Sequence, residues 1–306
     1  MGGAIGVAFL FGPAKSWAQL DDFNDGDDTD WTRYDTIGTA LGSPQGMFSF
    51  PNGGYRLKTP PSPAPAQVGP ARIGSLRNAP VYADFYISVD LVNWDDSQDQ
   101  AMGILARITN IGLGTTDGYA FTYQNDDTDI SISRIADEDA DDVSGTAQNL
   151  QLDPTKDYRL VFIGRGEQLE GRVYELPDVV TPIAVVSGTD ASYGSGICGL
   201  IIYDNGNATG MRGADATFDN YFATIEEQPR LSLGDDFGTL LVKWSRRHQG
   251  FILQTSPTLG PTAIWTDIDS FFIQETETEF LYGVDARAEP LKNQFFRLNK
   301  PAPALR

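Results

Sequence analysis

The sequence is strongly acidic: among its 306 residues, 42 Asp and Glu residues outnumber 22 Lys and Arg residues, which leaves a formal charge of −20. A surface with that charge repels phosphates, so nucleic acid is not an expected partner. Hydrophobic residues make up 41% of the chain and charged residues 21%, which is enough apolar material for one large folded domain and one small one.

Two residue types that serve many catalytic sites are almost absent. The single cysteine, Cys198, lies in an apolar run and is expected to fill a core, and no disulfide can form within the chain. The single histidine is His248, so we expect neither a histidine-based catalytic triad nor a multi-histidine metal site.

Residues 1–18 have the pattern of a signal peptide. A short apolar run from Gly2 to Pro13 is followed by Ser16 and Ala18, small residues at the two positions that a signal peptidase reads. The pattern lacks the usual basic residues before the apolar run. No other stretch reaches the roughly 20 apolar residues of a membrane helix. We therefore expect a secreted or cell-surface protein that is not an integral membrane protein.

Short strands and turns follow the N-terminal segment. After an acidic turn in residues 20–34, the strands Met47–Phe50 and Tyr55–Lys58 flank the hairpin sequence Pro51–Gly54. Residues 59–70 contain five prolines, which cannot donate to a sheet ladder, so this segment is predicted to be a surface loop inside one domain.

The clearest strand pattern is Val81–Leu91, where apolar and polar residues alternate. Because successive side chains leave a strand on opposite faces, the odd positions are expected in a core. The even positions, which include Tyr82 and Tyr86, are expected on a wetter face.

Later strand patterns complete an all-β sandwich, and no segment has a convincing helical period. A boundary is expected near residues 226–229, followed by about 70 residues of short strands whose core would contain Trp244 and Trp265. The predicted organisation is a signal peptide at 1–18, a jelly-roll domain at 19–226 and a small immunoglobulin- or fibronectin-like β-domain at 229–300. The strands expected after the central one are Ala101–Arg107, Tyr119–Tyr123, Ile130–Arg134, Tyr158–Gly164, Glu167–Tyr174, Ile183–Val186, Ile197–Tyr203 and Ala214–Ile225.

Three short motifs carry a resemblance to a known superfamily: Asp21–Asp25 with Trp31, Phe48–Tyr55, and Ala216–Ala223. Together they resemble the concanavalin A-like jelly rolls of laminin G-like and family 16 glycosidase-type domains, over residues 19–226. The resemblance implies an antiparallel jelly roll whose first and last strands lie side by side.

The same resemblance implies a structural calcium ion, bound away from the ligand groove. Matched residue by residue, its ligands would be Asp22, the carbonyl of Gly54 and Asp219. Calcium binds six to eight hard oxygen ligands without strict geometry, so this donor set is reasonable. The alternative is that the aspartates of residues 21–30 only decorate a solvated turn.

The C-terminal region resembles a small module at the ends of secreted multidomain bacterial proteins. The matching stretches are Leu253–Ser256, Trp265–Asp267 and Phe295–Leu298. This resemblance implies an extracytoplasmic protein and no particular chemistry.

Catalysis is the less favoured interpretation. A retaining glycosidase of the family 16 type needs two glutamates that bracket an aspartate on one strand, and no such strand is present. The acidic segment Asp137–Asp142 is expected to be a solvated loop, with a second cation site as the alternative. A lyase site would need tyrosine beside arginine, and Arg107, Tyr119, Tyr123 and Arg134 are available without a spacing that forces them together.

A carbohydrate-binding module needs only aromatic side chains and polar neighbours on a sheet. Trp94, beside two aspartates, is the best stacking candidate, although packing over a sandwich edge is the alternative for its ring. The predicted ligand-binding residues are Trp94, Tyr82, Tyr86, Arg107 and Tyr123.

We therefore expect a secreted carbohydrate-binding or adhesive protein with a structural calcium ion, and we favour a non-catalytic role over catalysis. Its partners would be a polysaccharide or glycan, or other extracellular protein chains. The first alternative is a structural or matrix subunit without a small-molecule ligand. The second is a polysaccharide hydrolase or lyase.

Overall fold

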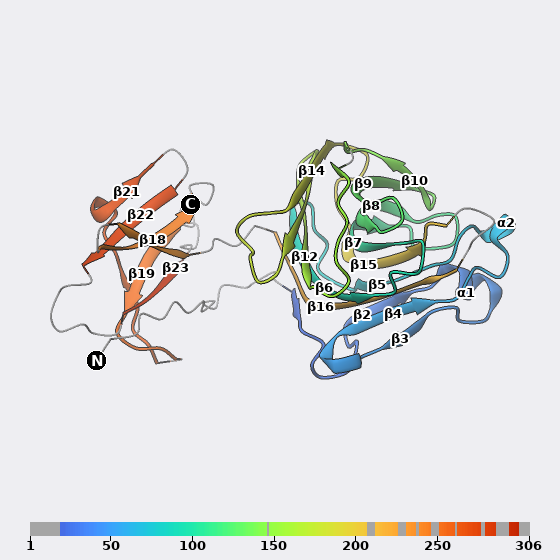
Figure 1. The fold of residues 1–306 in the computed structure, drawn as a ribbon, viewed down its shortest axis with the longest axis horizontal. Helices are drawn as coiled ribbons and strands as arrows, with labels where there is room; N and C mark the ends of the chain where they lie inside the picture. The colour runs from blue at the N-terminus through green and yellow to red at the C-terminus, as the bar shows by residue number, and fades with distance from the viewer. Residues whose placement is uncertain are drawn as a thin grey trace, which may run out of the picture. The chain divides into compact units, whose positions relative to one another are not determined.

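The computed structural model describes residues 19–145, 147–206, 212–225, 231–236, 239–245, 251–260, 262–276, 279–285 and 294–299. The predicted signal peptide, the expected boundary at 226–229 and His248 lie outside these residues. The chain divides into two compact units, of which the larger contains the described residues up to 225 and the smaller those from 231 onward (Figure 1).

One layer of the larger unit, which we call sheet A, contains eight strands, including the first and last of the unit. The last strand, β16, is central and pairs with three others. The strand order is β14 (Ala184–Thr189), β13 (Gln168–Glu175), β12 (Tyr158–Arg165), β6 (Phe85–Trp94), β16 (Ala214–Thr224), β4 (Tyr55–Thr59) and β3 (Met47–Ser49), with β1 (Gln19–Asp21) also paired to β16.

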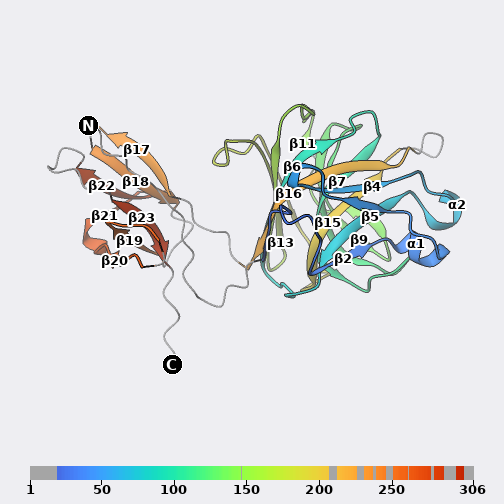
Figure 2. The same cartoon turned by 90° about the horizontal axis from the view of Figure 1, so that it is seen from below.

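The second layer, sheet B, also contains eight strands. Every strand pairing in the described part of the chain is antiparallel, and the two sheets face each other as a sandwich (Figures 1 and 2). The predicted all-β, antiparallel sandwich is therefore confirmed. The order is β10 (Asp139–Asp142), β9 (Asp129–Ala136), β8 (Asp117–Gln124), β7 (Gln100–Thr109), β15 (Ile197–Asp204), β5 (Arg72–Arg77) and β2 (Trp31–Tyr34), with β11 (Ala147–Gln148) paired to β9.

Short helices connect strands of the larger unit. They are α1 (Thr36–Leu41), the 3₁₀ turn η1 (Pro51–Gly53) and α2 (Pro65–Val68). The carboxylate of Asp35 caps α1 by accepting from the Gly38 N–H at 2.8 Å, and Gly42 ends it with a left-handed φ of 67°. The proline-rich segment lies between β4 and β5 of the same unit, as expected of a loop within one domain.

The prediction of a central strand at Val81–Leu91 is only partly correct. The strand begins at Phe85, not at Val81, whose side chain is exposed, and it continues to Trp94. Its inward positions lie in the main core as expected. The expectation that the even positions face solvent is wrong, because Tyr86 and Asp90 are also buried. A second apolar cluster covers that face, and it consists of Tyr86, Val161, Ile163 and Tyr174, packed against Phe222.

The outer face of sheet B is also covered. A third apolar cluster lies there, made by Tyr34, Leu76, Leu105, Ile108, Ala120 and Ile201. The hydroxyl of Tyr34, on edge strand β2, contacts the hydroxyl of Thr116 at 3.2 Å and Glu138 Oε1 at 2.5 Å. Because Glu138 follows β9, near the opposite edge of the sheet, these contacts hold the loop before β8 and the β9–β10 turn over the cluster.

The smaller unit has two sheets around its own core. Leu231, Val242, Trp244, Leu253 and Phe296 form that core, which confirms the expectation for Trp244. Trp265 lies outside it, half-buried, with the guanidinium of Arg297 4.4 Å from its ring centre. One sheet has the order β17 (Ser232–Asp236), β18 (Thr239–Ser245), β22 (Glu279–Asp285) and β21 (Ile273–Glu275). The other has the order β20 (Thr266–Asp267), β19 (Ile252–Ser256) and β23 (Phe295–Asn299), and the turn η2 (Ser270–Phe272) precedes β21.

Within the described residues, no helix combines the length and the apolar character needed to cross a membrane.

Candidate functional site

A polar hollow of about 220 Å³ opens on the outer face of sheet A. It lies where β4, β16 and β6 run side by side, because Thr217 of β16 is paired with Arg56 on one side and Asn93 on the other. Alternation along β4 turns Tyr55 and Leu57 into the core and leaves the intervening cations facing outward. The lining residues are Arg56, Lys58, Asn93, Trp94, Asp95, Asp215 and Thr217.

Asp215 is the charge centre of the polar hollow. Arg56 donates to both of its carboxylate oxygens, at 2.7 Å from Nε and 2.5 Å from Nη2, and Lys58 Nζ lies 2.9 Å away. The Asp215 side chain is 9% exposed, whereas those of Arg56 and Lys58 are 40% and 44% exposed. Burial alone would raise the pKa of Asp215, but the hydrogen bonds and charges of the two cations outweigh it and lower that pKa.

The second carboxylate, Asp95, is used within its own turn. It accepts hydrogen bonds from the backbone and hydroxyl of Ser97 at 3.1 and 2.6 Å, and from Gln98 at 3.1 Å. The Ser97 bond and then the Gln98 bond lower the pKa of Asp95. The turn is tied to the sandwich by the fully buried Gln100, whose amide donates to the carbonyls of Asp95 and Asp215 and accepts from the Asp215 N–H.

The electrostatics of the polar hollow favour binding over acid catalysis. A glycosidase needs one carboxylic acid that keeps its proton near the working pH. Both carboxyl groups of this hollow have lowered pKa values and are ionised at neutral pH. They therefore cannot protonate a leaving group there, but they can hold the neighbouring cations in fixed positions.

The structure places Trp94 at the polar hollow, with its ring turned inward. The ring is 5% exposed and meets the rings of Tyr123 and Tyr158, each at a centroid distance of 6.2 Å, while Nε1 donates to Asp96 at 3.1 Å. A register shift of β6 against β16 causes this, because Leu91 pairs with Phe218 and Asn93 with Thr217. The interrupted alternation buries Trp94, so it is not an open stacking platform.

The other predicted sugar-binding tyrosines are also buried. Tyr82 is fully buried, and its hydroxyl donates to the Ala223 carbonyl at 3.3 Å. Tyr123 is 1% exposed and accepts from the Leu152 N–H at 3.2 Å. Tyr86 is 7% exposed and packs in the outer cluster of sheet A. The prediction that these rings stack on a sugar is therefore wrong for this conformation, since none offers an open face.

Arg107 is a structural residue in this fold. It is 2% exposed, and its guanidinium donates to the carbonyls of Ala83, Tyr193 and Gly166 at 2.8, 2.9 and 2.8 Å. Its charge lies 5.4 Å from the ring centre of Phe85. The predicted contact with a ligand is therefore wrong, because three loops of the protein already use its donors.

The three predicted calcium ligands are brought close together. Strand β1 ends with Asp21 opposite Tyr221, and β4 begins with Tyr55 opposite Phe218, so Asp22, Gly54 and Asp219 all lie beside one stretch of β16. Burial raises the pKa of Asp219, as do the charges of Asp90, Asp22 and Asp157, while the Asn220 N–H lowers it in part.

The acidic segment Asp137–Asp142 is a tight hairpin turn followed by β10. Its prediction as a solvated loop is wrong for Glu138, whose side chain is 4% exposed and pairs with Arg72 at 2.5 Å. Thr36 and the Gly114 N–H also bind this carboxylate, at 2.8 and 2.7 Å. Among the described residues, no three His, Cys, Asp or Glu side chains converge as a metal site.

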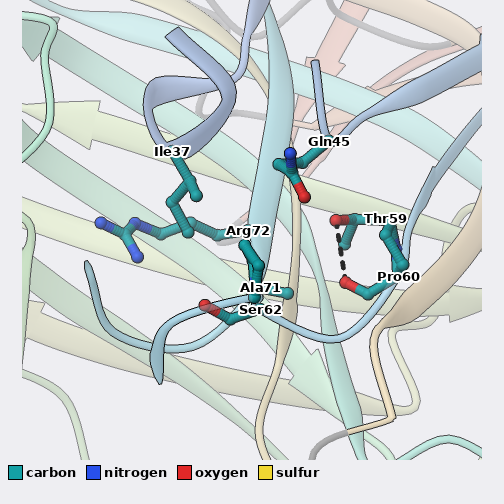
Figure 3. A pocket seen from close by; sticks show the side chains of 8 residues that line it. Ile37, Gln45, Thr59, Pro60, Ser62, Ala71 and Arg72 are labelled. Carbon is teal, nitrogen blue, oxygen red and sulfur yellow. Dashed lines mark hydrogen bonds between the residues drawn. The ribbon is translucent and has the colours of Figure 1, made fainter. Parts of the chain in front are cut away.

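A smaller cavity lies between α1, the proline-rich loop and the start of β5 (Figure 3). Its lining includes Ile37, Thr59 and Ser62, and the guanidinium of Arg72 points away from Thr59. The cavity is too small for a water molecule. We therefore assign it no ligand.

The polar residues of the hollow were missed by sequence reasoning. The outward cations of Tyr55–Thr59 and the polar positions of Ala214–Thr217 were visible as alternation. Their proximity depends on the β4–β16 register, which pairs Lys58 with Asp215, 157 positions later in the chain.

No protein-family model matches this chain, and no curated protein matches it. Solved structures with a similar fold include a carbohydrate-binding module from Bacillus subtilis, at 15% identity and a TM-score of 0.47, over 64% of this chain and 96% of that one. Ulex europaeus lectin II has 13% identity and a TM-score of 0.45, over 68% and 97%. A Bacillus licheniformis β-glucanase has 10% identity and a TM-score of 0.45, over 69% and 98%. At these values the likenesses carry no argument about activity.

Proposed function

We propose that this chain is a secreted, non-catalytic carbohydrate-binding protein that holds one sugar unit in the polar hollow. The observation that carries the proposal is the hollow itself, where Arg56, Lys58 and Asn93 present polar groups around an ionised, buried Asp215. Such groups form hydrogen bonds with hydroxyl and ring oxygens of a sugar. The signal-like pattern of residues 1–18 supports export.

The size of the polar hollow supports a single small unit of a longer glycan. Its volume of about 220 Å³ is below the roughly 300–1,000 Å³ of clefts that enclose drug-sized ligands. A site of this size gives weak affinity by itself. Repeated units along a polysaccharide would raise the apparent affinity when several sites bind one chain.

A calcium ion beside Asp219 is part of the proposal. Asp22 and Asp219, the Gly54 carbonyl and the amide oxygen of Asn24, which lies beside Gly53, form a donor set made of oxygen alone. The raised pKa of Asp219 fits this assignment, because a divalent cation would offset the charges of the neighbouring carboxylates. When bound, the ion would link β1, β4 and β16 and stabilise the sandwich. Since β4 and β16 also line the hollow, this proposal departs from the expectation of an ion bound away from the ligand groove.

One observation favours the structural-subunit alternative. The outer face of sheet B is covered by the contacts of Tyr34 with Thr116 and Glu138, and the apolar cluster beneath is buried. A structural subunit needs no ligand groove, so a covered outer face of sheet B is compatible with that role. The polar hollow on sheet A distinguishes the two functions, because only the carbohydrate-binding protein needs it.

A glycan array with the whole chain tests the proposal, once with calcium and once with a chelator. Any bound glycan is then incubated with the protein and analysed for shortened products. We expect binding without products, and weaker binding in the chelator if the ion supports the strands around the hollow. Failure to bind any glycan in either buffer would overturn the proposal in favour of a structural subunit, and shortened products would make the chain an enzyme.

A further inference from the structure

The polar hollow contains more hydrogen-bond donors than free acceptors. Asp215 already accepts from Arg56 twice and from Lys58 once, and Asp95 accepts three hydrogen bonds within its turn. An arginine has five N–H donors and a lysine three. Asp215 therefore uses two of the five N–H donors of Arg56 and one of the three of Lys58.

The unused donors belong to partly exposed side chains that line the hollow. Within the described residues, Arg56 and Lys58 form no side-chain hydrogen bond other than those to Asp215, and the exposed amide of Asn93 forms none. Asp215 uses Arg56 through Nε and Nη2, which leaves the Nη1–Nη2 edge of the guanidinium free. That edge can form a second two-point contact with a planar carboxylate.

The charge of the polar hollow differs from that of the rest of the chain. The formal charge of the protein is −20, whereas the lining of this hollow is formally neutral, because Arg56 and Lys58 balance Asp215 and Asp95. Asp95 is also nearby, and its charge acts on Arg56. Its oxygens accept from Ser97 and Gln98, so it does not occupy the free donors. A ligand rich in hydrogen-bond acceptors therefore complements the unused N–H donors of this hollow better than a ligand rich in hydroxyl donors does.

We propose that the polar hollow selects a carboxylated sugar, so that the ligand is a uronic acid unit of an acidic polysaccharide. This inference rests on the proposed carbohydrate-binding function. The sugar carboxylate would bind the free edge of Arg56 and the ammonium of Lys58, with Asn93 at a neighbouring hydroxyl. Salt weakens such binding, because both cations are well exposed.

Titration calorimetry of the whole chain with soluble trigalacturonate and its full methyl ester tests this inference. The ester differs from the acid by the lost charge and the added methyl group of each carboxyl, and raising the salt concentration separates the contribution of charge from that of size. We expect the acid to bind at least tenfold more tightly than the ester, and this preference to shrink as salt is raised. The substitution Lys58→Met should weaken acid binding about tenfold. The matched control Lys156→Met removes a lysine that pairs with Glu175 outside the hollow, at 2.8 Å, and should bind like the wild type.

A second variant separates recognition from folding. Arg56→Lys keeps the positive charge but removes the two-edged guanidinium, so it should keep the melting temperature within a few degrees and still lose part of the acid preference. Equal binding of acid and ester would overturn the uronate assignment and leave the carbohydrate-binding proposal intact. Tighter binding of a sulfated trisaccharide than of trigalacturonate would also overturn it. Absence of binding to these ligands and to every glycan of the array would overturn both proposals.

Discussion

Arg72 and Glu138 form a buried ion pair, with 2.5 Å between Nη2 and Oε2, although 66 positions separate them in the sequence. Glu138 adopts a left-handed φ of 64°, a conformation in which glycine is usual at a tight turn. Its carboxylate is also bound by Tyr34, Thr36 and the Gly114 N–H. The unusual turn residue therefore places the charge that holds two loops over sheet B.

Replacing Glu138 should destabilise the larger unit. Glu138→Gln leaves Arg72 buried without its partner, and removal of one member of a buried pair costs roughly 3–5 kcal/mol. Hydrogen bonds lower the pKa of Glu138 despite its burial, so the loss should be complete at neutral pH and should shrink as the pH falls through the folded-state pKa. Urea unfolding at several pH values measures both effects.

Asp141→Asn is the matched control for Glu138→Gln. Its partner Arg134 is 2.7 Å away on the surface, and the Asp141 side chain is 67% exposed. Exposed pairs contribute roughly 0–1 kcal/mol. Equal stability of Glu138→Gln and Asp141→Asn would show that the cover over sheet B does not depend on the buried pair.

The alternation of residues predicted the strands, but it did not predict which face would be open. Tyr86 and Asp90 follow the pattern of a wet face and are buried, because β12 and β13 bring aromatic and charged side chains to that face. The inward turn of Trp94 depends on a bulge in the pairing of β6 with β16. The partners of Arg56 lie far along the chain. Register and bulges depend on tertiary packing, and a single sequence does not reveal them.

Arg107→Met should cost about 3 kcal/mol or more of folding free energy. The substitution leaves the carbonyls of Ala83, Tyr193 and Gly166 without their charged donor inside the sandwich, and hydrogen bonds to charged groups each contribute roughly 1.5–3 kcal/mol. Denaturant unfolding measures the loss. Lys156→Met is the control, because it removes only an exposed ion pair and should change the free energy of unfolding little. A loss no larger than that of the control would mean that Arg107 is not the link between these loops.

Asp129→Asn should stabilise the protein at neutral pH. Burial raises the pKa of Asp129 to about 6, with further contributions from Asp127, Asp142 and Asp126. Ionisation of this group therefore weakens the fold as the pH rises through about 6, whereas below the ordinary value of 3.8 it is protonated in both states. After allowance for solvent screening, we expect a gain of about 1 kcal/mol at pH 7.

Thermal unfolding of Asp129→Asn and the wild type at pH 7 and pH 3.5 measures this gain and its expected disappearance in acid. Asp153→Asn is the opposite control, because the Thr155 hydrogen bonds lower the pKa of Asp153. That variant should not be stabilised at neutral pH. Destabilisation of Asp129→Asn at pH 7 would contradict the raised pKa.

Asp219→Asn should change the stability in opposite directions with and without calcium. Without the ion, the substitution removes a charge that burial and nearby carboxylates disfavour, so the variant should melt at a higher temperature than the wild type. With calcium, the wild type should gain about 2.7 kcal/mol at an ion concentration of 100 Kd, and the variant should gain little. Asp178→Asn, at a surface turn, should respond to calcium like the wild type. A wild type that does not respond to calcium would contradict the site.

The most direct test of the central claim is to fill the polar hollow and measure glycan binding. Asn93 is exposed at the hollow, and Ser187 is exposed on β14, at the far edge of sheet A. We predict that Asn93→Trp abolishes binding to the best glycan of the array, while Ser187→Trp binds like the wild type and both variants keep its melting temperature. Equal binding by the two variants would contradict the assignment of the carbohydrate site to the polar hollow.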